Sequence, residues 1–186
     1  WIVLLAGGMA TGCSADPGSP SLPDSRDSLR YRDPRRCGTI TDARCSEVSG
    51  LAASRLRDGW FWIHNDSGDE PRLFAIDSTG RLHAIVTLQG ADALDWEDIA
   101  SIEKDGRRWI YVGDIGDNLR ARQDIVVYRI EEPHLLADST VVELTVPAES
   151  ARFSYPDGPS NCEALLVHPL SGDLYFITKT EDPTCQ

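Results

Sequence analysis

A five-residue pattern that recurs three times constrains the fold of this chain more than any other feature. It opens three apolar stretches, at residues 47–51, 95–99 and 161–165. Each stretch is followed by a turn that contains a glycine, which is Gly59, Gly106 or Gly172. An aromatic-rich stretch comes next, at residues 60–63, 109–112 or 174–177. Glycine-containing turns between β-branched or aromatic segments are typical of hairpins. The sequence therefore predicts three copies of one β-hairpin.

Further strands are expected after the first two hairpins. They fall at residues 72–77, 82–88 and 125–130. One more lies within residues 141–146 or 151–155, and the sequence does not decide between these segments. Four strands repeated at intervals of about 48 and then about 66 residues are typical of β-propeller blades. We therefore predict an all-β chain with about two and a half four-stranded blades, a fragment of a larger β-propeller. A β-sandwich is the alternative.

The N-terminal residues have the pattern of an exported protein. Residues 1–12 are uncharged and mostly apolar, are too few to span a bilayer as a helix, and fit a truncated signal peptide. The next residue, Cys13, is the predicted lipidation site because residues 10–13 resemble a bacterial lipobox; an incidental cysteine is the alternative. Residues 13–36 are rich in Ser, Pro and Asp and predict a tether, which leaves residues 37–186 as the partial propeller domain.

Location and charge limit the partners of the chain. An exported lipoprotein is expected in the bacterial cell envelope, where it touches the membrane only through its lipid anchor. The sequence has 30 Asp and Glu against 18 Lys and Arg, a net charge of −12. Nucleic-acid binding relies on cationic patches that neutralise phosphates, so we expect no nucleic-acid partner. The same charge suits divalent cations wherever the carboxylates cluster.

Four cysteines remain if Cys13 is lipidated, and an even number in an exported protein permits disulfides. Cys162 lies at the start of a first strand, and Cys185 lies just past the second strand of the same hairpin. Antiparallel pairing would bring these two within reach of a disulfide. Cys37 and Cys45 are then the remaining pair and would close a short loop before the first hairpin.

Acidic residues gather where the two strands of each hairpin meet. The start of the first strand lies beside the end of the second, and residues one and three of the pattern point to one side because side chains alternate. Carboxylates from different hairpins therefore converge on one rim, and they repel one another unless protonated or bound to a cation. Oxygen ligands favour Ca²⁺, with Mg²⁺ second. The predicted Ca²⁺ ligands are Glu47, Asp66, Asp95, Glu97, Asp114 and Glu163.

Turn formation is the alternative explanation for these acids. The motif Asp-x-Gly-Asp occurs at residues 66–69 and 114–117, and Asp and Gly are common turn formers. His64 and Lys179 lie at the ends of second strands, beside the rim, and are candidates for a catalytic acid, base or electrostatic clamp. A lone histidine near carboxylates is more often a hydrogen-bond partner.

Several of these segments resemble bacterial secreted β-propeller lipoproteins of unassigned function. The matching segments are residues 49–51, 64–68, 95–100, 113–118 and 163–166. More distantly, the chain resembles the phytase-like and esterase-like six-bladed propellers. This resemblance implies a six-bladed parent with Ca²⁺ at an acidic mouth. Propeller phytases use many Lys and Arg for phosphate, whereas this rim shows only Lys179.

Two functions are compatible with this pattern. The first is a binding or scaffold module of the cell envelope, whose acidic mouth and Ca²⁺ recognise a small molecule, a sugar or a peptide. The second is a Ca²⁺-dependent hydrolase of phosphoesters, esters or lactones, in which the ion activates water or polarises the substrate. We expect the first, because nothing in the rim selects a leaving group, and leave open whether the chain is an enzyme.

Overall fold

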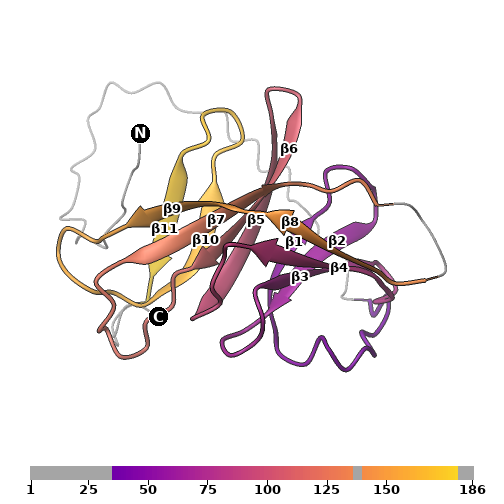
Figure 1. Ribbon diagram of the computed structural model, residues 1–186, viewed down its shortest axis with the longest axis horizontal. Coiled ribbons are helices and arrows are strands. Elements are labelled where there is room, and N and C mark those ends of the chain that lie inside the picture. Colours follow the sequence, from indigo (N-terminus) through magenta and orange to yellow (C-terminus); the bar gives the residue numbers. More distant parts are fainter. Residues whose placement is uncertain (1–34, 136–139, 180–186) are drawn as a thin grey trace, which may run out of the picture.

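The computed structural model describes residues 35–135 and 140–179 of the 186-residue chain (Figure 1). These residues form eleven β-strands. They contain no helix, and therefore none of the length and hydrophobicity needed to cross a membrane. The prediction of an all-β chain is confirmed. The predicted signal peptide, Cys13, nearly all of the tether and Cys185 lie outside the described residues.

The strands form three sheets, and each sheet contains one of the predicted hairpins. The first sheet has the order β1 (Val48–Ala53), β2 (Trp60–Asn65), β3 (Arg72–Asp77), β4 (Leu82–Gln89) and β8 (Val142–Pro147). The second sheet has the order β5 (Trp96–Lys104), β6 (Arg107–Asp114), β7 (Ile125–Glu131) and β9 (Glu149–Phe153). The third sheet pairs β10 (Cys162–Val167) with β11 (Leu174–Thr178). All three hairpins are thus confirmed, and the sheets of the described residues are open.

The sheets pack face to face, with the second sheet in the middle. Strand β5 packs against both β1 and β10. One apolar cluster, which includes the buried Trp62 and Trp96, lies between the first and second sheets. Another, which includes Leu165 and Phe176, lies between the second and third sheets. The second sheet is therefore apolar on both faces, as expected for a sheet that is covered on both sides.

A β-bulge interrupts the first strand of every sheet at the same place in the repeated pattern. The second residue of the pattern pairs with the last residue of the neighbouring strand, and the fourth residue pairs with the residue before that. The third residue therefore has no partner of its own; it is Ser49, Glu97 or Glu163. A bulge bends its strand and changes the direction of the extra side chain.

The two segments between which the sequence did not decide are both strands, and they belong to different sheets (Figure 1). Strand β8 runs parallel to β4 at the edge of the first sheet, whereas β9 runs antiparallel to β7 in the second. Only Ala148 separates them, and its N–H donates to the Gln89 carbonyl over 3.0 Å. The chain thus crosses from the second sheet to the first and back, which ties their outer edges together.

The described cysteines are free thiols. Cys37 is exposed, whereas Cys45 packs against an apolar cluster on the outer face of the first sheet. The two cysteines of the predicted Cys37–Cys45 disulfide are both free in this structure. Cys162 is fully buried, and burial raises the pKa of its thiol. Its predicted bridge to Cys185 involves a residue outside the described part of the chain.

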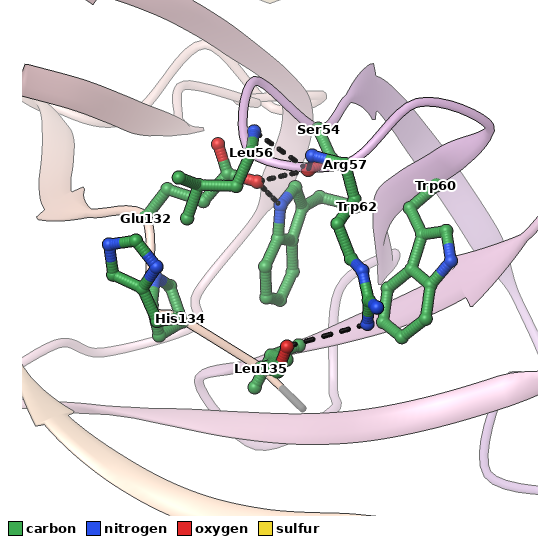
Figure 2. Close-up of a pocket in the computed structure, with 9 residues that line it drawn as sticks. Ser54, Leu56, Arg57, Trp60, Trp62, Glu132, His134 and Leu135 are labelled. Atoms are coloured by element: carbon green, nitrogen blue, oxygen red, sulfur yellow. Dashed lines mark hydrogen bonds between the residues drawn. The ribbon is translucent and has the colours of Figure 1, made fainter. Parts of the chain in front are cut away.

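Glu132 links the first and second sheets at the end of the strands away from the bulges (Figure 2). Its buried carboxylate accepts hydrogen bonds from Trp62 Nε1 over 2.8 Å, from the Arg55 N–H over 2.8 Å and from Ser54 Oγ. It lines a pocket of about 220 Å³, which Arg57 also borders. Because three protein donors bind this carboxylate, its role is to hold the sheets together.

Gly50 leaves space for a buried ring, which a substitution can test. A Cβ at residue 50 would lie 2.3 Å from His64 Nε2. We expect Gly50→Ala to lower the free energy of unfolding by about 1–3 kcal/mol, because the ring must move within a packed core. Urea unfolding measures this change. Ala53→Ser, at an exposed residue of the same strand, is the control and should change it by less than about 0.5 kcal/mol. Equal stabilities of the two variants would contradict this packing.

Candidate metal centre

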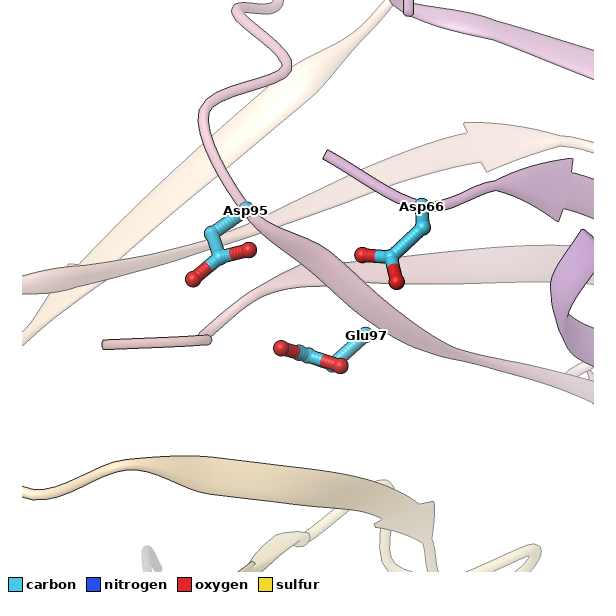
Figure 3. A group of neighbouring side chains, drawn as sticks. All are labelled: Asp66, Asp95 and Glu97. Atoms are coloured by element: carbon cyan, nitrogen blue, oxygen red, sulfur yellow. The ribbon is translucent and has the colours of Figure 1, made fainter. Parts of the chain in front are cut away.

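Three of the predicted ligands come together at the bulged end of the strands (Figure 3). Asp66 follows β2 in the first sheet, Asp95 precedes β5 in the second, and Glu97 is the bulged residue of β5. Each offers one carboxylate oxygen, and these oxygens all lie within 4.8 Å of one another. Asp95 and Glu97 are half-buried, whereas Asp66 contacts solvent. This acidic cluster is therefore shared by two sheets.

One backbone hydrogen bond, repeated in all three sheets, positions the segment that follows each second strand. In the first sheet the Asp66 N–H donates to the Glu47 carbonyl over 2.8 Å. In the second sheet the Ile115 N–H donates to the Asp95 carbonyl over 3.1 Å, and in the third the Lys179 N–H donates to the Asn161 carbonyl over 2.8 Å. The three donor residues are thus structurally equivalent. They are an aspartate, a buried isoleucine and a lysine, so the sheets differ in charge at this position.

Gly116 lies directly against two of the three carboxylates. A Cβ at this residue would be 2.4 Å from Asp95 Oδ2 and 2.4 Å from Glu97 Oε1. The Gly116 N–H also donates to the Asp95 carbonyl over 3.1 Å. Because only glycine lets the backbone approach this closely, the loop after β6 packs against both acids. No pattern in the sequence marked Gly116 as part of the site.

Asp114 is not one of the converging carboxylates, and its side chain holds the backbone instead. It is buried, and its Oδ1 accepts hydrogen bonds from the Asp95 N–H over 3.1 Å and from Arg122 Nη1 over 2.7 Å. Its counterpart in the first sheet is Asn65, whose Oδ1 accepts from the Glu47 N–H over 3.4 Å. The two Asp-x-Gly-Asp motifs therefore do not superpose. The first residue of one motif, Asp114, is the last residue of β6, whereas the first residue of the other, Asp66, follows the last residue of β2.

Two other predicted ligands, Glu47 and Glu163, also lie outside the acidic cluster. Glu163 Oε1 accepts hydrogen bonds from Lys179 Nζ over 2.6 Å and from Asn161 Nδ2 over 2.8 Å. Its charge is therefore balanced by a lysine of the same hairpin. Glu47 is exposed and contributes its backbone carbonyl to the bond with Asp66.

His64 is enclosed between the first two sheets. The residue is 0 % exposed, its Nδ1 donates to the Asn65 carbonyl over 2.7 Å, and its ring meets the edge of Trp96 with centroids 5.7 Å apart. Burial lowers the pKa of this imidazole. In this structure His64 is thus a buried neutral ring rather than an accessible acid or base.

Within the described part of the chain, no cation donates a hydrogen bond to a carboxylate of the acidic cluster. Burial, followed by the charges of Glu163, Asp95 and Asp66, raises the pKa of Glu97 to about 7, and Lys179 opposes this only in part. Burial and the charge of Asp66 also raise the pKa of Asp95. Both shifts show that the ionised cluster is disfavoured and that a bound cation would relieve it.

Asp98 is a further residue that the sequence analysis missed. Its Oδ2 accepts a hydrogen bond from the Leu165 N–H over 2.8 Å, and its Oδ1 accepts from the Ile99 N–H over 2.8 Å. It therefore joins β5 to β10, and through them the second sheet to the third. The signal was a carboxylate at the fourth position of the pattern, where the other copies have Gly50 and Ala164.

The raised pKa of Glu97 predicts a pH dependence of stability. Between its ordinary pKa of 4.5 and about 7, the folded protein binds a proton that the unfolded chain has lost. The free energy of unfolding should therefore fall as pH rises through this range. Urea unfolding at a series of pH values should show this fall in the wild-type protein and a smaller fall in Glu97→Gln. Glu103→Gln, at the far end of β5, is the control and should show the same fall as wild type. Identical pH profiles for wild type and Glu97→Gln would count against the cluster's electrostatics.

Comparisons with known proteins give no relative for this chain. No family model matches it, nor does any curated protein or solved structure. The site consists of three carboxylates from two sheets, a glycine packed against two of them, and a buried aspartate that fixes the backbone of one.

Proposed function

We propose that this chain is a binding module that holds Ca²⁺ between Asp66, Asp95 and Glu97. One observation supports this proposal above all. Three carboxylates from two sheets have oxygens within 4.8 Å of one another, and the pKa of Glu97 is raised to about 7. Like charges at this distance disfavour the ionised state unless a cation neutralises them. A divalent cation would remove the repulsion and join the first sheet to the second.

The spacing of the oxygens suits Ca²⁺. Its bonds to oxygen are about 2.3–2.6 Å long, so two ligand oxygens on opposite sides of the ion lie up to about 5 Å apart. The bonds of Mg²⁺ are about 2.0–2.1 Å long and limit this distance to about 4.2 Å. Oxygens that all lie within 4.8 Å of one another fall inside the span of a Ca²⁺ shell, and the preference for Ca²⁺ over Mg²⁺ rests on the flexible geometry that Ca²⁺ accepts. Three carboxylates leave positions in that shell for a ligand, such as a sugar hydroxyl or a peptide carbonyl.

We also propose that the three sheets are successive blades of a β-propeller. Each sheet begins with a bulged hairpin, has the same N–H-to-carbonyl bond after its second strand, and packs face to face with the next. Blades that repeat in this way would bring their first strands together around one axis. The acidic cluster lies at the start of these first strands, which would be the mouth of the propeller.

The location in the bacterial cell envelope and the lipid anchor at Cys13 are proposed from the sequence. Residues 13–36 would tether the sheets to the anchor and keep the cluster away from the membrane. A small molecule, sugar or peptide from outside would then reach the bound ion.

A metal-dependent hydrolase is the second candidate, and one observation favours it. A pKa near 7, as for Glu97, suits a general acid or base. The other catalytic candidates are engaged, however, since His64 is buried and Lys179 is paired with Glu163. Assays with phosphoester, ester and lactone substrates, with and without EDTA, distinguish the two functions, because turnover that requires metal would establish the hydrolase.

Calcium binding predicts a stabilisation that depends on the cluster. A ligand that binds only the folded state raises the free energy of unfolding by about 2.7 kcal/mol at a hundredfold excess over its Kd. Ca²⁺ should therefore raise the melting temperature of the wild-type protein relative to EDTA. The double variant Asp66→Asn, Glu97→Gln should lose this shift, because it retains only one of the three charges. Differential scanning calorimetry measures both.

Glu103→Gln is the matched control for this experiment. It removes one negative charge from the same strand, at the end away from the cluster, and should keep the full Ca²⁺ shift. The proposal is contradicted if Ca²⁺ leaves the wild-type melting temperature unchanged. It is also contradicted if the double variant responds as strongly as the control.

A further inference from the structure

A groove lies on the face of the second sheet that carries β10 and β11. It consists of two adjoining pockets of about 400 Å³ and about 280 Å³, which share Tyr111, Arg129 and Gly172. The larger pocket lies where the turn after β5 meets the turn after β10. This is the end of β5 away from the acidic cluster, so the groove is a separate site.

Three cationic side chains line the larger pocket of this groove, although the chain as a whole is strongly acidic. The larger pocket is lined by Lys104, Arg107 and Arg129, with Asp105 as its one carboxylate. The Lys104 ammonium donates to the Ser171 carbonyl and forms no ion pair with a carboxylate of the described residues. An ammonium has three donors, so two remain for a ligand.

The two arginines are held in place by an aromatic ring. The guanidinium carbon of Arg107 lies 4.2 Å from the centre of the Trp109 ring, and that of Arg129 lies 4.3 Å from it. A guanidinium stacked on a ring keeps the N–H donors in its own plane available for a carboxylate. Both arginines already bind carboxylates in this way, Arg107 to Glu131 over 2.7 Å and Arg129 to Glu149.

These two ion pairs are replaceable. The side chains of Glu131 and Glu149 are 52 % and 64 % exposed, and ion pairs in contact with water contribute little to stability. A carboxylate that also reaches Lys104 would gain a partner that neither glutamate has in this structure. Both arginines are therefore already oriented to bind a carboxylate.

The remainder of the groove combines apolar side chains with Arg129, Glu149 and Ser150. The apolar side chains that line the smaller pocket are Tyr111, Val127, Ala151 and Leu174. Pockets that bind small molecules combine apolar walls with a few polar groups that fix the orientation of the ligand. Here Lys104 and Arg107 lie at one end, and the apolar side chains lead away from them beside Glu149, which is paired with Arg129.

We propose that this groove binds a small organic carboxylate. Its charged group lies between Lys104 and Arg107, and its apolar body lies along Tyr111 toward Leu174. The proposal does not depend on metal binding at the acidic cluster, which lies at the opposite end of the strands.

Benzoate is a suitable probe, and calorimetric titration in EDTA tests its binding without any contribution from metal. The affinity should fall as NaCl is added, because salt screens an exposed charge pair. Benzyl alcohol has the same ring without the charge and should bind about tenfold more weakly. Lys104→Met, which keeps an unbranched side chain, should weaken benzoate binding by about tenfold, the loss expected for one charge-assisted hydrogen bond.

Arg152→Met is the control, because it removes a positive charge from β9 at a residue that pairs with Asp124 and does not line the groove. It should bind benzoate as wild type does, and Arg107→Met should repeat the loss seen with Lys104→Met. The proposal is overturned if wild type gives no binding heat with millimolar benzoate. It is also overturned if benzyl alcohol binds as tightly as benzoate. Equal benzoate affinities of Lys104→Met, Arg107→Met and the control would overturn it as well.

Discussion

The bulge at the third residue of each repeated pattern is the constraint on which the rest of the structure depends. It releases one residue per sheet from strand pairing at the point where neighbouring sheets meet. Between the first two sheets the released residues contact each other, since Ser49 Oγ donates to the Glu97 carbonyl over 3.2 Å. The same bulge directs the Glu97 side chain toward Asp66 and Asp95. One backbone irregularity thus fixes both the contact between sheets and the acidic cluster.

Other carboxylates of this chain have their charge balanced by nearby donors, and the acidic cluster differs from them in this respect. Asp114 is buried, but Arg122 and two backbone N–H groups balance its charge. Glu163 has Lys179, in the same hairpin. Asp95 and Glu97 are half-buried, no cation of the described residues donates a hydrogen bond to them, and the pKa of both is raised. In the proposed function, a divalent cation held by these oxygens would offset this cost.

The sequence was sufficient for features that depend on neighbouring residues. Turn glycines and aromatic strands predicted all three hairpins, and the pattern placed Asp95, Glu97 and Asp66 at one end of the strands. Pairing between distant segments was not accessible in this way. Strands β8 and β9 pair with different sheets, and nothing local distinguishes their partners.

The difference between the predicted ligand set and the acidic cluster has the same origin. Asp66 and Asp114 occupy the same position of a common sequence motif. In the structure, however, Asp114 makes the hydrogen bond that Asn65 makes in the first sheet. A shift of one residue moves a side chain from the solvent side of a turn into the backbone network. Gly116 was overlooked because its role is visible only in its distance to Asp95 and Glu97.

The position of a bound ion tests the central claim most directly. Crystals of the protein grown with Ca²⁺, and measured for its anomalous scattering, would show whether an ion lies between the two sheets. We predict a peak about 2.3–2.6 Å from carboxylate oxygens of Asp66, Asp95 and Glu97. Well-ordered carboxylates with no peak between them, or an ion held by residues of one sheet alone, would contradict the account.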